Sequence, residues 1–229
     1  DALRKRYGED KVEHLSSALC PAHIGATLKN VQGRLEDETD CDWCLVATSC
    51  VEAGVDLSFR TGMRERASLV SSLQTAGRVN REGKWSSAEV WDFQLVEEGL
   101  IRSNPGLKNS REVLGYLIDE GEIGPEYATK AMAKELNLRN IRDKIDKITK
   151  AERCMKFPEV AEEFCVIESD TVTAVVDDDL AERLQAGDVV DPNELQLLSV
   201  SIRKYLTGEY AVDKIEHPGL ARLRSYPEV

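Results

Sequence analysis

The chain has 229 residues, of which 41% are hydrophobic and 31% charged, a composition that excludes disordered and collagen-like proteins. No apolar run approaches the roughly 18 residues that a membrane-spanning helix needs, so we expect no membrane insertion. The formal net charge is −12 and is concentrated in residues 157–229, which hold 16 acidic and 6 basic residues, so a polyanionic partner is expected to meet the first half of the chain.

The six cysteines are irregularly spaced and do not predict a disulfide framework, which makes the cytosol the expected compartment. Cys41-Asp-Trp-Cys44 has the spacing of a metal-binding pair. A closed zinc site needs four ligands in recognisable pairs, and the sequence has no second Cys-x-x-Cys. We therefore predict no metal site.

Strands and helices alternate in the first hundred residues. Apolar periodicity and turn residues predict, in chain order, a helix at 2–7, a strand at 14–19, a helix at 22–35, strands at 45–47 and 55–59, a helix at 68–80 and a strand at 90–95. This alternation predicts an α/β fold with a mainly parallel sheet.

After residue 99 the pattern becomes helical and then mixed. Helices are predicted at 111–120, at 126–136 and from 138 to about 150, and the last is rich in lysine and arginine around an apolar stripe. We interpret its charges as a solvated face, with a nucleic-acid contact as the alternative. Beyond Phe157-Pro158, strands are predicted at 164–167, 171–176 and 197–202 and a helix at 180–185. The predicted domains are therefore 1–100, a helical connector at 101–156, and a small acidic α+β domain at 157–229.

Two segments carry the residues suited to chemistry. The first runs from Val46 to Phe59: a strand ends in Thr48 and Ser49, a Glu-Ala-Gly passage follows, and Asp56 comes next. Ligands bind at the carboxyl ends of strands in open α/β sheets, and glycine lets the backbone approach a ligand closely. An ordinary strand–turn–strand connection would show the same pattern.

The second segment is Gln74-Thr-Ala-Gly-Arg78-Val-Asn-Arg81. At about 100° per residue, Gln74, Arg78 and Arg81 share one face of the predicted helix, and Leu69, Leu73 and Ala76 form the opposite, apolar face. A guanidinium fork suits phosphate oxygens, particularly the charge that develops during phosphoryl transfer. Because both arginines are expected to be exposed, replacing either should leave folding nearly intact.

These segments resemble motifs V and VI of superfamily 2 helicases, in which Gln-x-x-Gly-Arg-x-x-Arg supplies an arginine finger to ATP. With the segments 14–23 (His-Leu-Ser-Ser-Ala-Leu-Cys-Pro-Ala-His), 64–69 (Arg-Glu-Arg-Ala-Ser-Leu) and 76–83, the chain is similar to the second RecA-like domain of the helicase-nuclease of type I CRISPR-Cas systems. The likeness is strong over about 14–95 and looser over 157–205. It implies a RecA-like fold of the P-loop NTPase type.

The resemblance also implies roles for individual residues. Ser16 and Thr48 would bind the backbone of single-stranded DNA. Gly54, Asp56 and Gly77 would belong to the nucleotide site. Gln74, Arg78 and Arg81 would reach the γ-phosphate, with Arg81 as the finger.

The sequence contains no Gly-x-x-x-x-Gly-Lys-Ser/Thr loop and no histidine–aspartate nuclease cluster. The resemblance therefore implies the C-terminal part of a longer ATP-dependent DNA translocase, whose other RecA-like and nuclease domains and Mg²⁺ ligands lie outside this chain. Its implied partners are ATP, Mg²⁺, single-stranded DNA and the CRISPR surveillance complex (Cascade). Two alternatives are another superfamily 2 enzyme, such as a restriction or RNA helicase, and a detached, non-catalytic helicase lobe that acts as a binding or regulatory module.

Overall fold

The computed structural model describes residues 2–96, 98, 104–138, 142–164, 170–208, 211–214 and 220–225. The chain divides into two compact units, one formed by Asp1–Val51 with Glu168–Val229 and the other by Glu52–Ile167. The first unit thus combines the two ends of the sequence. None of the helices in the described part is long and apolar enough to cross a bilayer.

The N-terminal part of the first unit is a small βαβ arrangement. Its elements are α1 (Ala2–Tyr7), η1 (Glu9–Lys11), β1 (Val12–Leu15), α2 (Pro21–Glu36), β2 (Cys44–Ala47) and η2 (Ser49–Val51). Strands β1 and β2 pair in parallel, with Leu15 opposite Ala47, and α2 connects them. The proline at the start of α2 is favourable because its missing N–H is not needed there. The predicted strand 14–19 is shorter and begins earlier, since the chain turns after Leu15.

The C-terminal part of the first unit is a mixed four-stranded sheet in the order β6-β5-β8-β7. Its elements are β5 (Thr171–Val175), α8 (Asp178–Gln185), α9 (Pro192–Leu197), β6 (Ser199–Arg203), η5 (Lys204–Leu206), β7 (Ala211–Lys214) and β8 (Leu220–Ser225). Strands β5 and β6 are the strands predicted at 171–176 and 197–202. Residues 165–167 of the strand predicted at 164–167 lie outside the described residues. Strands β7 and β8 were not predicted.

A shared core joins the two parts of the first unit. Cys20, at the start of α2, packs with Ala174 of β5 and with Val200 and Ile202 of β6, and all four are buried. This core places the loop between β1 and α2 beside the C-terminal sheet.

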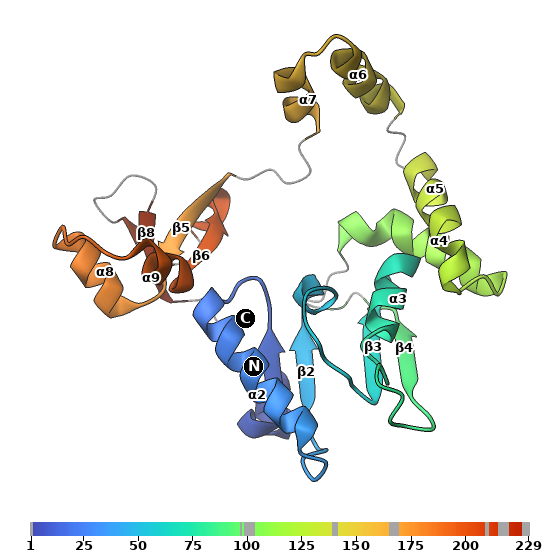
Figure 1. The fold of residues 1–229 in the computed structure, drawn as a ribbon, viewed down its shortest axis with the longest axis horizontal. Helices are drawn as coiled ribbons and strands as arrows, with labels where there is room; N and C mark the ends of the chain where they lie inside the picture. Colours follow the sequence, from blue (N-terminus) through green and yellow to red (C-terminus); the bar gives the residue numbers. More distant parts are fainter. Residues whose placement is uncertain are drawn as a thin grey trace. The chain divides into compact units, whose positions relative to one another are not determined.

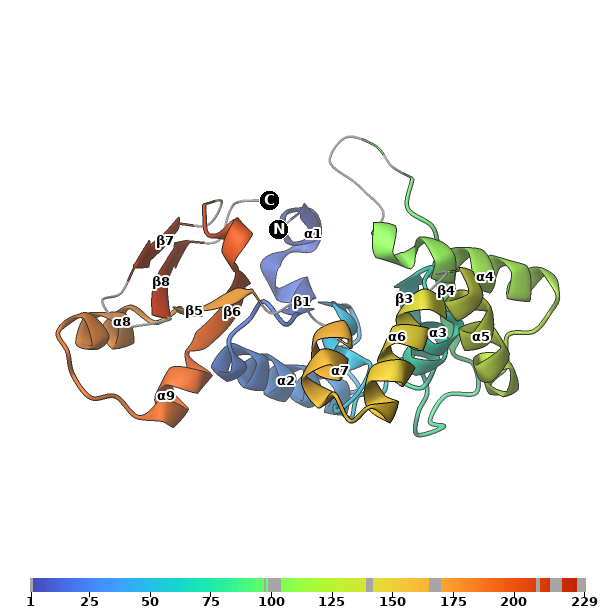
Figure 2. The ribbon, with the colours of Figure 1, turned by 90° about the horizontal axis from the view of Figure 1, so that it is seen from above.

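The second unit contains a parallel strand pair covered by helices. Its elements are β3 (Thr61–Glu65), α3 (Leu69–Ala76), β4 (Glu89–Phe93), η3 (Pro105–Leu107), α4 (Lys108–Asp119), η4 (Pro125–Tyr127), α5 (Ala128–Leu138), α6 (Arg142–Arg153) and α7 (Phe157–Glu163). Figures 1 and 2 show α3 beside β3 and β4, with α4 and α5 next to it. Leu69 of α3 is buried against Val113, Leu114 and Leu117 of α4 and Ala131 of α5.

The predicted α/β fold with parallel strands is confirmed by the pairs β1–β2 and β3–β4. Within residues 1–100, one predicted strand was wrong, and one strand was missed. Residues 55–59 do not form a strand, because only Phe59 makes a bridge, to Val79. Strand β3 was missed because its sequence, Thr-Gly-Met-Arg-Glu, lacks the alternation of apolar residues that marks a half-buried strand.

Candidate functional site

Helix α3 ends earlier than the sequence predicts, and this changes where the two arginines lie. The helix begins after Ser68, whose Oγ accepts a hydrogen bond from the Ser71 amide at 3.0 Å, and it ends at Ala76, with Gly77 as its C-cap. Its predicted continuation to residue 80 is wrong. The amide of Phe59 donates to the Arg78 carbonyl, and the Asn80 amide donates to the Phe59 carbonyl, both at 2.8 Å. This pairing holds residues 78–80 in a turn.

Gln74 stays on the exposed side of α3, as predicted, because Leu69 and Leu73 on the other side pack against α4 and α5. Ala76, which the helical periodicity placed on the apolar face, is exposed at the end of the helix. The amide group of Gln74 is thus available to a ligand.

Arg78 is engaged within its own unit. Its guanidinium donates to the Val55 carbonyl at 2.5 Å and to the Glu52 carbonyl at 2.9 Å, and the side chain is half-buried. The expectation that both arginines lie free on one helical face therefore fails for Arg78. Removing its side chain would leave two backbone carbonyls without their donors, so its replacement should not be neutral.

Arg81 and Asp56 form an accessible ion pair. The Arg81 Nε and the Asp56 Oδ1 are 3.1 Å apart, and the side chains are 46% and 79% exposed. A pair this exposed contributes at most about 1 kcal/mol, so a polyphosphate could compete for the guanidinium at little cost. Of the predicted nucleotide-site residues, the structure brings these two together.

Glu52 was not predicted as a site residue, yet its side chain connects the loop 52–56 to β3. Its Oε1 lies 2.5 Å from an Nη atom of Arg64, and these side chains are only 13% and 22% exposed. The Arg64 Nε is buried and has no hydrogen-bond partner among the described residues. Two charged residues twelve positions apart gave no periodic signal, which is why sequence reasoning missed the pair.

The two glycines of the predicted nucleotide site differ. Gly54 is exposed and has φ +77°, a conformation that side-chain-bearing residues avoid, and no atom lies near the position of an added Cβ. Gly77 has φ −66° and caps α3 in a conformation open to other residues. The exposed backbone at Gly54 is therefore open to a ligand.

Ser16 and Thr48, the predicted DNA contacts, follow the paired ends of β1 and β2. The Thr48 amide donates to the Leu15 carbonyl at 3.0 Å, so the parallel register brings the two residues to the same edge of the sheet. The Thr48 side chain is exposed, whereas Ser16 is buried and its Oγ accepts from the Ala18 amide at 3.3 Å. The hydroxyl of Thr48 is the more accessible of the two.

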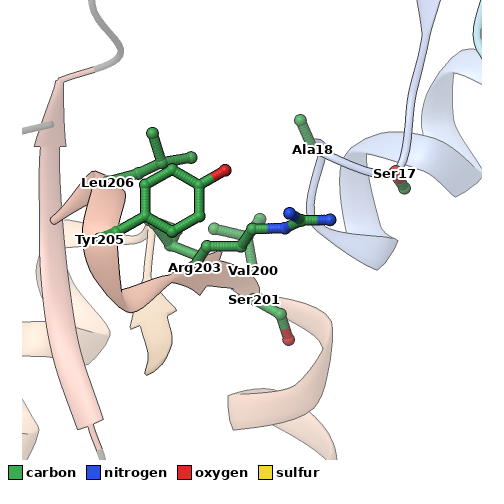
Figure 3. Close-up of a pocket in the computed structure, with 8 residues that line it drawn as sticks. Ser17, Ala18, Val200, Ser201, Arg203, Tyr205 and Leu206 are labelled. Atoms are coloured by element: carbon green, nitrogen blue, oxygen red, sulfur yellow. The ribbon is translucent and has the colours of Figure 1, made fainter. Parts of the chain in front are cut away.

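A shallow pocket of about 230 Å³ lies beside this edge, between the loop after β1 and strand β6 (Figure 3). Ser17 and Ala18 form one wall and Arg203 and Tyr205 form the other, and the Arg203 guanidinium points toward the loop. Ser17, which lines the pocket, directly follows Ser16 in the chain.

His14 lies in β1 and is partly buried. Partial burial lowers its pKa, and the nearby positive charge of Arg4 lowers it further. No group of three or more potential metal ligands occurs among the described residues. Cys41 and Cys44 are exposed free thiols.

Comparison with known proteins finds a matching family model and a named relative. Residues 1–84 match the family model described as CRISPR-associated nuclease/helicase Cas3, C-terminal. The chain is 36% identical over 72 residues to the CRISPR-associated nuclease/helicase Cas3 of Haloferax volcanii, an alignment that spans 30% of this chain and 7% of that protein. All predicted site residues lie within the 84 matched positions.

Solved structures share the fold. The crystal structure of T. fusca Cas3 has a TM-score of 0.59 and 13% identity, over 97% of this chain and 33% of that chain. The structure titled T. fusca Cas3-ATP has a TM-score of 0.57 and 13% identity, over 93% of this chain and 32% of that chain. This chain therefore spans about a third of the solved proteins that it resembles. In the sequence of its first 84 residues and in its fold, the chain is similar to the C-terminal helicase region of Cas3.

Proposed function

We propose that this chain is the C-terminal part of an ATP-dependent helicase that translocates on single-stranded DNA in type I CRISPR interference, and that it supplies the arginine finger and part of the DNA track. The observation that carries the proposal is the accessible Arg81–Asp56 pair on a turn held by backbone pairing to Phe59. A fixed backbone with an accessible guanidinium is the arrangement that an arginine finger needs.

The chemistry of the proposed site is electrostatic. A guanidinium stabilises charge that develops on the transferring phosphoryl group, and its planar fork can contact two oxygens at once. Gln74 is exposed on the adjoining helix α3, and its amide could orient a water molecule or a phosphate oxygen. We assign the side chains of Arg81 and Gln74 to the γ-phosphate.

ATP is the proposed nucleotide, and solved relatives titled T. fusca Cas3-ADP and T. fusca Cas3-ATP support it. The accessible Arg81 and the open backbone at Gly54 fit the polyphosphate of such a ligand. Mg²⁺, which neutralises phosphate charge, does not fit here, because the described residues offer no cluster of acidic ligands for it. We assign its ligands to another domain.

The proposed DNA track runs along the edge marked by Ser16 and Thr48. An exposed hydroxyl such as that of Thr48 suits contacts to phosphate oxygens, which position a strand without reading its sequence. The surveillance complex Cascade is the proposed partner that would deliver the DNA.

The test is the DNA-stimulated ATPase of the complete helicase that carries this chain. We expect Arg81→Ala to lower turnover about 10³-fold or more, since the finger acts in the transition state. Arg81→Lys should not restore it, because an ammonium keeps the charge and loses the two-donor fork.

Arg60→Ala is the matched control, since Arg60 is an exposed arginine in the same stretch of chain. It should leave turnover within about twofold of wild type, as expected for a surface substitution away from the chemistry. If Arg81→Ala folds normally and retains wild-type ATPase, the finger assignment is wrong.

A further inference from the structure

We propose that Arg78 is a positioning residue for the loop 52–56 and does not itself bind the nucleotide phosphate. Its two terminal nitrogens each donate to a backbone carbonyl of this loop, Nη1 to Val55 and Nη2 to Glu52. The guanidinium thereby spans residues 52–55. It fixes the backbone just before Asp56, which follows Val55 directly. The consequence for catalysis rests on the function proposed above.

The geometry leaves Arg78 little freedom to act as a phosphate ligand. Its carbonyl accepts from the Phe59 amide and its own amide donates to the Thr75 carbonyl, so the backbone is fixed on both sides. The side chain is half-buried, with its fork occupied. Arg81 differs in each respect, because its single described partner is an exposed carboxylate that a ligand can displace.

A second interaction holds the loop 52–56 through the side chain of Glu52. The Glu52 carboxylate pairs with Arg64 of β3, while the Glu52 carbonyl receives Arg78. Glu52 thus links strand β3 to the turn after α3. Because both side chains of the Glu52–Arg64 pair are mostly buried, breaking it leaves an unpaired charge in a poorly hydrated place.

The combined effect is to set the distance between Asp56 and Arg81. Gly54 alone would let the loop adopt many conformations, since φ +77° is readily accessible to glycine and so are the alternatives. The Arg78 hydrogen bonds on both sides of Gly54 select one of them. Arg81 is then held by Asp56 in a defined place until a phosphate replaces the carboxylate.

The first experiment measures amide hydrogen exchange of residues 52–56 in the 229-residue chain without nucleotide. Arg78→Ala should raise the exchange rate of these amides about tenfold or more, because two hydrogen bonds to the loop are lost. Arg81→Ala, the matched control, should change it less than about twofold, since an exposed ion pair contributes little. Glu52→Gln, which loses the Arg64 pair and keeps the carbonyl, should raise it as well.

Arg78→Lys covers the case in which Arg78→Ala does not fold. Its ammonium can still donate to one carbonyl, so exchange should lie between wild type and Arg78→Ala. If loop exchange in Arg78→Lys and in any folded Arg78→Ala equals that of Arg81→Ala, the positioning role is overturned. This measurement needs no ATPase activity, so it stands even if the proposed function fails.

The second experiment compares lysine variants in the complete helicase. A positioning role predicts that Arg78→Lys keeps ATPase turnover within about tenfold of wild type while Arg81→Lys does not, because only the finger needs the planar fork. Equal losses for the two lysine variants would make Arg78 a phosphate ligand and overturn the proposal.

Discussion

Asn80 combines an uncommon backbone conformation with two side-chain hydrogen bonds. Its φ of 48° lies in the left-handed region, which asparagine tolerates better than most residues. Its Nδ2 donates to the Trp85 carbonyl at 2.7 Å, and its Oδ1 accepts from the Trp85 amide at 3.0 Å. The residue therefore closes the loop 80–85, which carries Arg81.

We expect Asn80→Ala to lower the free energy of unfolding by about 1–3 kcal/mol, since both Trp85 groups lose their partner and alanine disfavours positive φ. Asn80→Gly should cost less than Asn80→Ala because glycine relieves the backbone cost. Urea denaturation measures both. A change below about 0.5 kcal/mol in both variants would mean that the loop does not depend on these bonds.

Residue types were predictable at the candidate site, whereas the partners of the side chains were not. The exposed position of Gln74 follows from the apolar face of its helix. The partners of Arg78 could not be found in this way, because the carbonyls of Glu52 and Val55 lie 26 and 23 positions away and leave no trace in side-chain identity. Backbone acceptors are equivalent in sequence, and only the fold selects among them.

Among the elements, β3 lies close to the end of α3 and to the turn that follows it at Gly62. A Cβ added to Gly62 would lie 2.7 Å from the Val79 Cγ2 and 3.3 Å from the Thr75 Cγ2. The glycine therefore lets the strand lie directly against the turn that carries Arg78 and Arg81. A side chain here must displace one of the two elements.

Gly62→Ala should destabilise the chain by about 1–3 kcal/mol, the usual cost of forcing an extra methyl group into a packed region. Adding Val79→Ala should recover part of the loss, because it removes the nearest methyl groups. Thermal and urea denaturation of the single and double variants test this.

Gly115→Ala is the control for Gly62→Ala. Gly115 lies within α4, and a Cβ there would make only an ordinary contact, 3.8 Å from an Arg66 nitrogen. Alanine is the better helix former, so we expect this variant to be at least as stable as wild type. Equal stability of Gly62→Ala and Gly115→Ala would show that the β3–α3 contact adapts.

Helices were predicted more accurately than strands, and the reason is physical. The predicted helix 22–35 became Pro21–Glu36 because its proline and its periodic apolar residues are local signals. Strand β3 has no such signal, since it is defined by pairing with β4, which begins more than twenty residues later. The end of α3 at Ala76 likewise depends on the pairing of Phe59 with the turn, which local periodicity cannot reveal.

At the scale of the whole molecule, residues 60–84 contain six basic and two acidic residues, yet they do not form an unbalanced positive surface. Four of these cations have acidic partners in the structure: Arg64 pairs with Glu52, Arg66 with Asp92, Arg81 with Asp56 and Lys84 with Glu82. Non-specific binding of nucleic acid depends on cations that neutralise phosphates. Under the proposed function, DNA would therefore be bound through local contacts such as that of Thr48, in place of a broad electrostatic attraction.

Because this chain is proposed to supply only the arginine finger and part of the DNA track, we predict that the 229-residue chain alone hydrolyses no ATP. A finger arginine stabilises a transition state that other groups must first assemble, by holding the β- and γ-phosphates and Mg²⁺. The sequence has no Gly-x-x-x-x-Gly-Lys-Ser/Thr loop for that purpose, and the described residues hold no group of metal ligands.

Phosphate release in the presence of saturating single-stranded DNA and Mg²⁺ should therefore equal that of a mock preparation. Turnover that Arg81→Ala abolishes would contradict the prediction, because the chain would then contain a complete phosphoryl-transfer site. Turnover that Arg81→Ala leaves unchanged would point to a contaminating ATPase, and the Arg81→Ala sample is thus the control for the wild-type measurement. Activity that appears only after a lobe with a P-loop is added, and that Arg81→Ala removes, is the result expected if the arginine acts across two lobes.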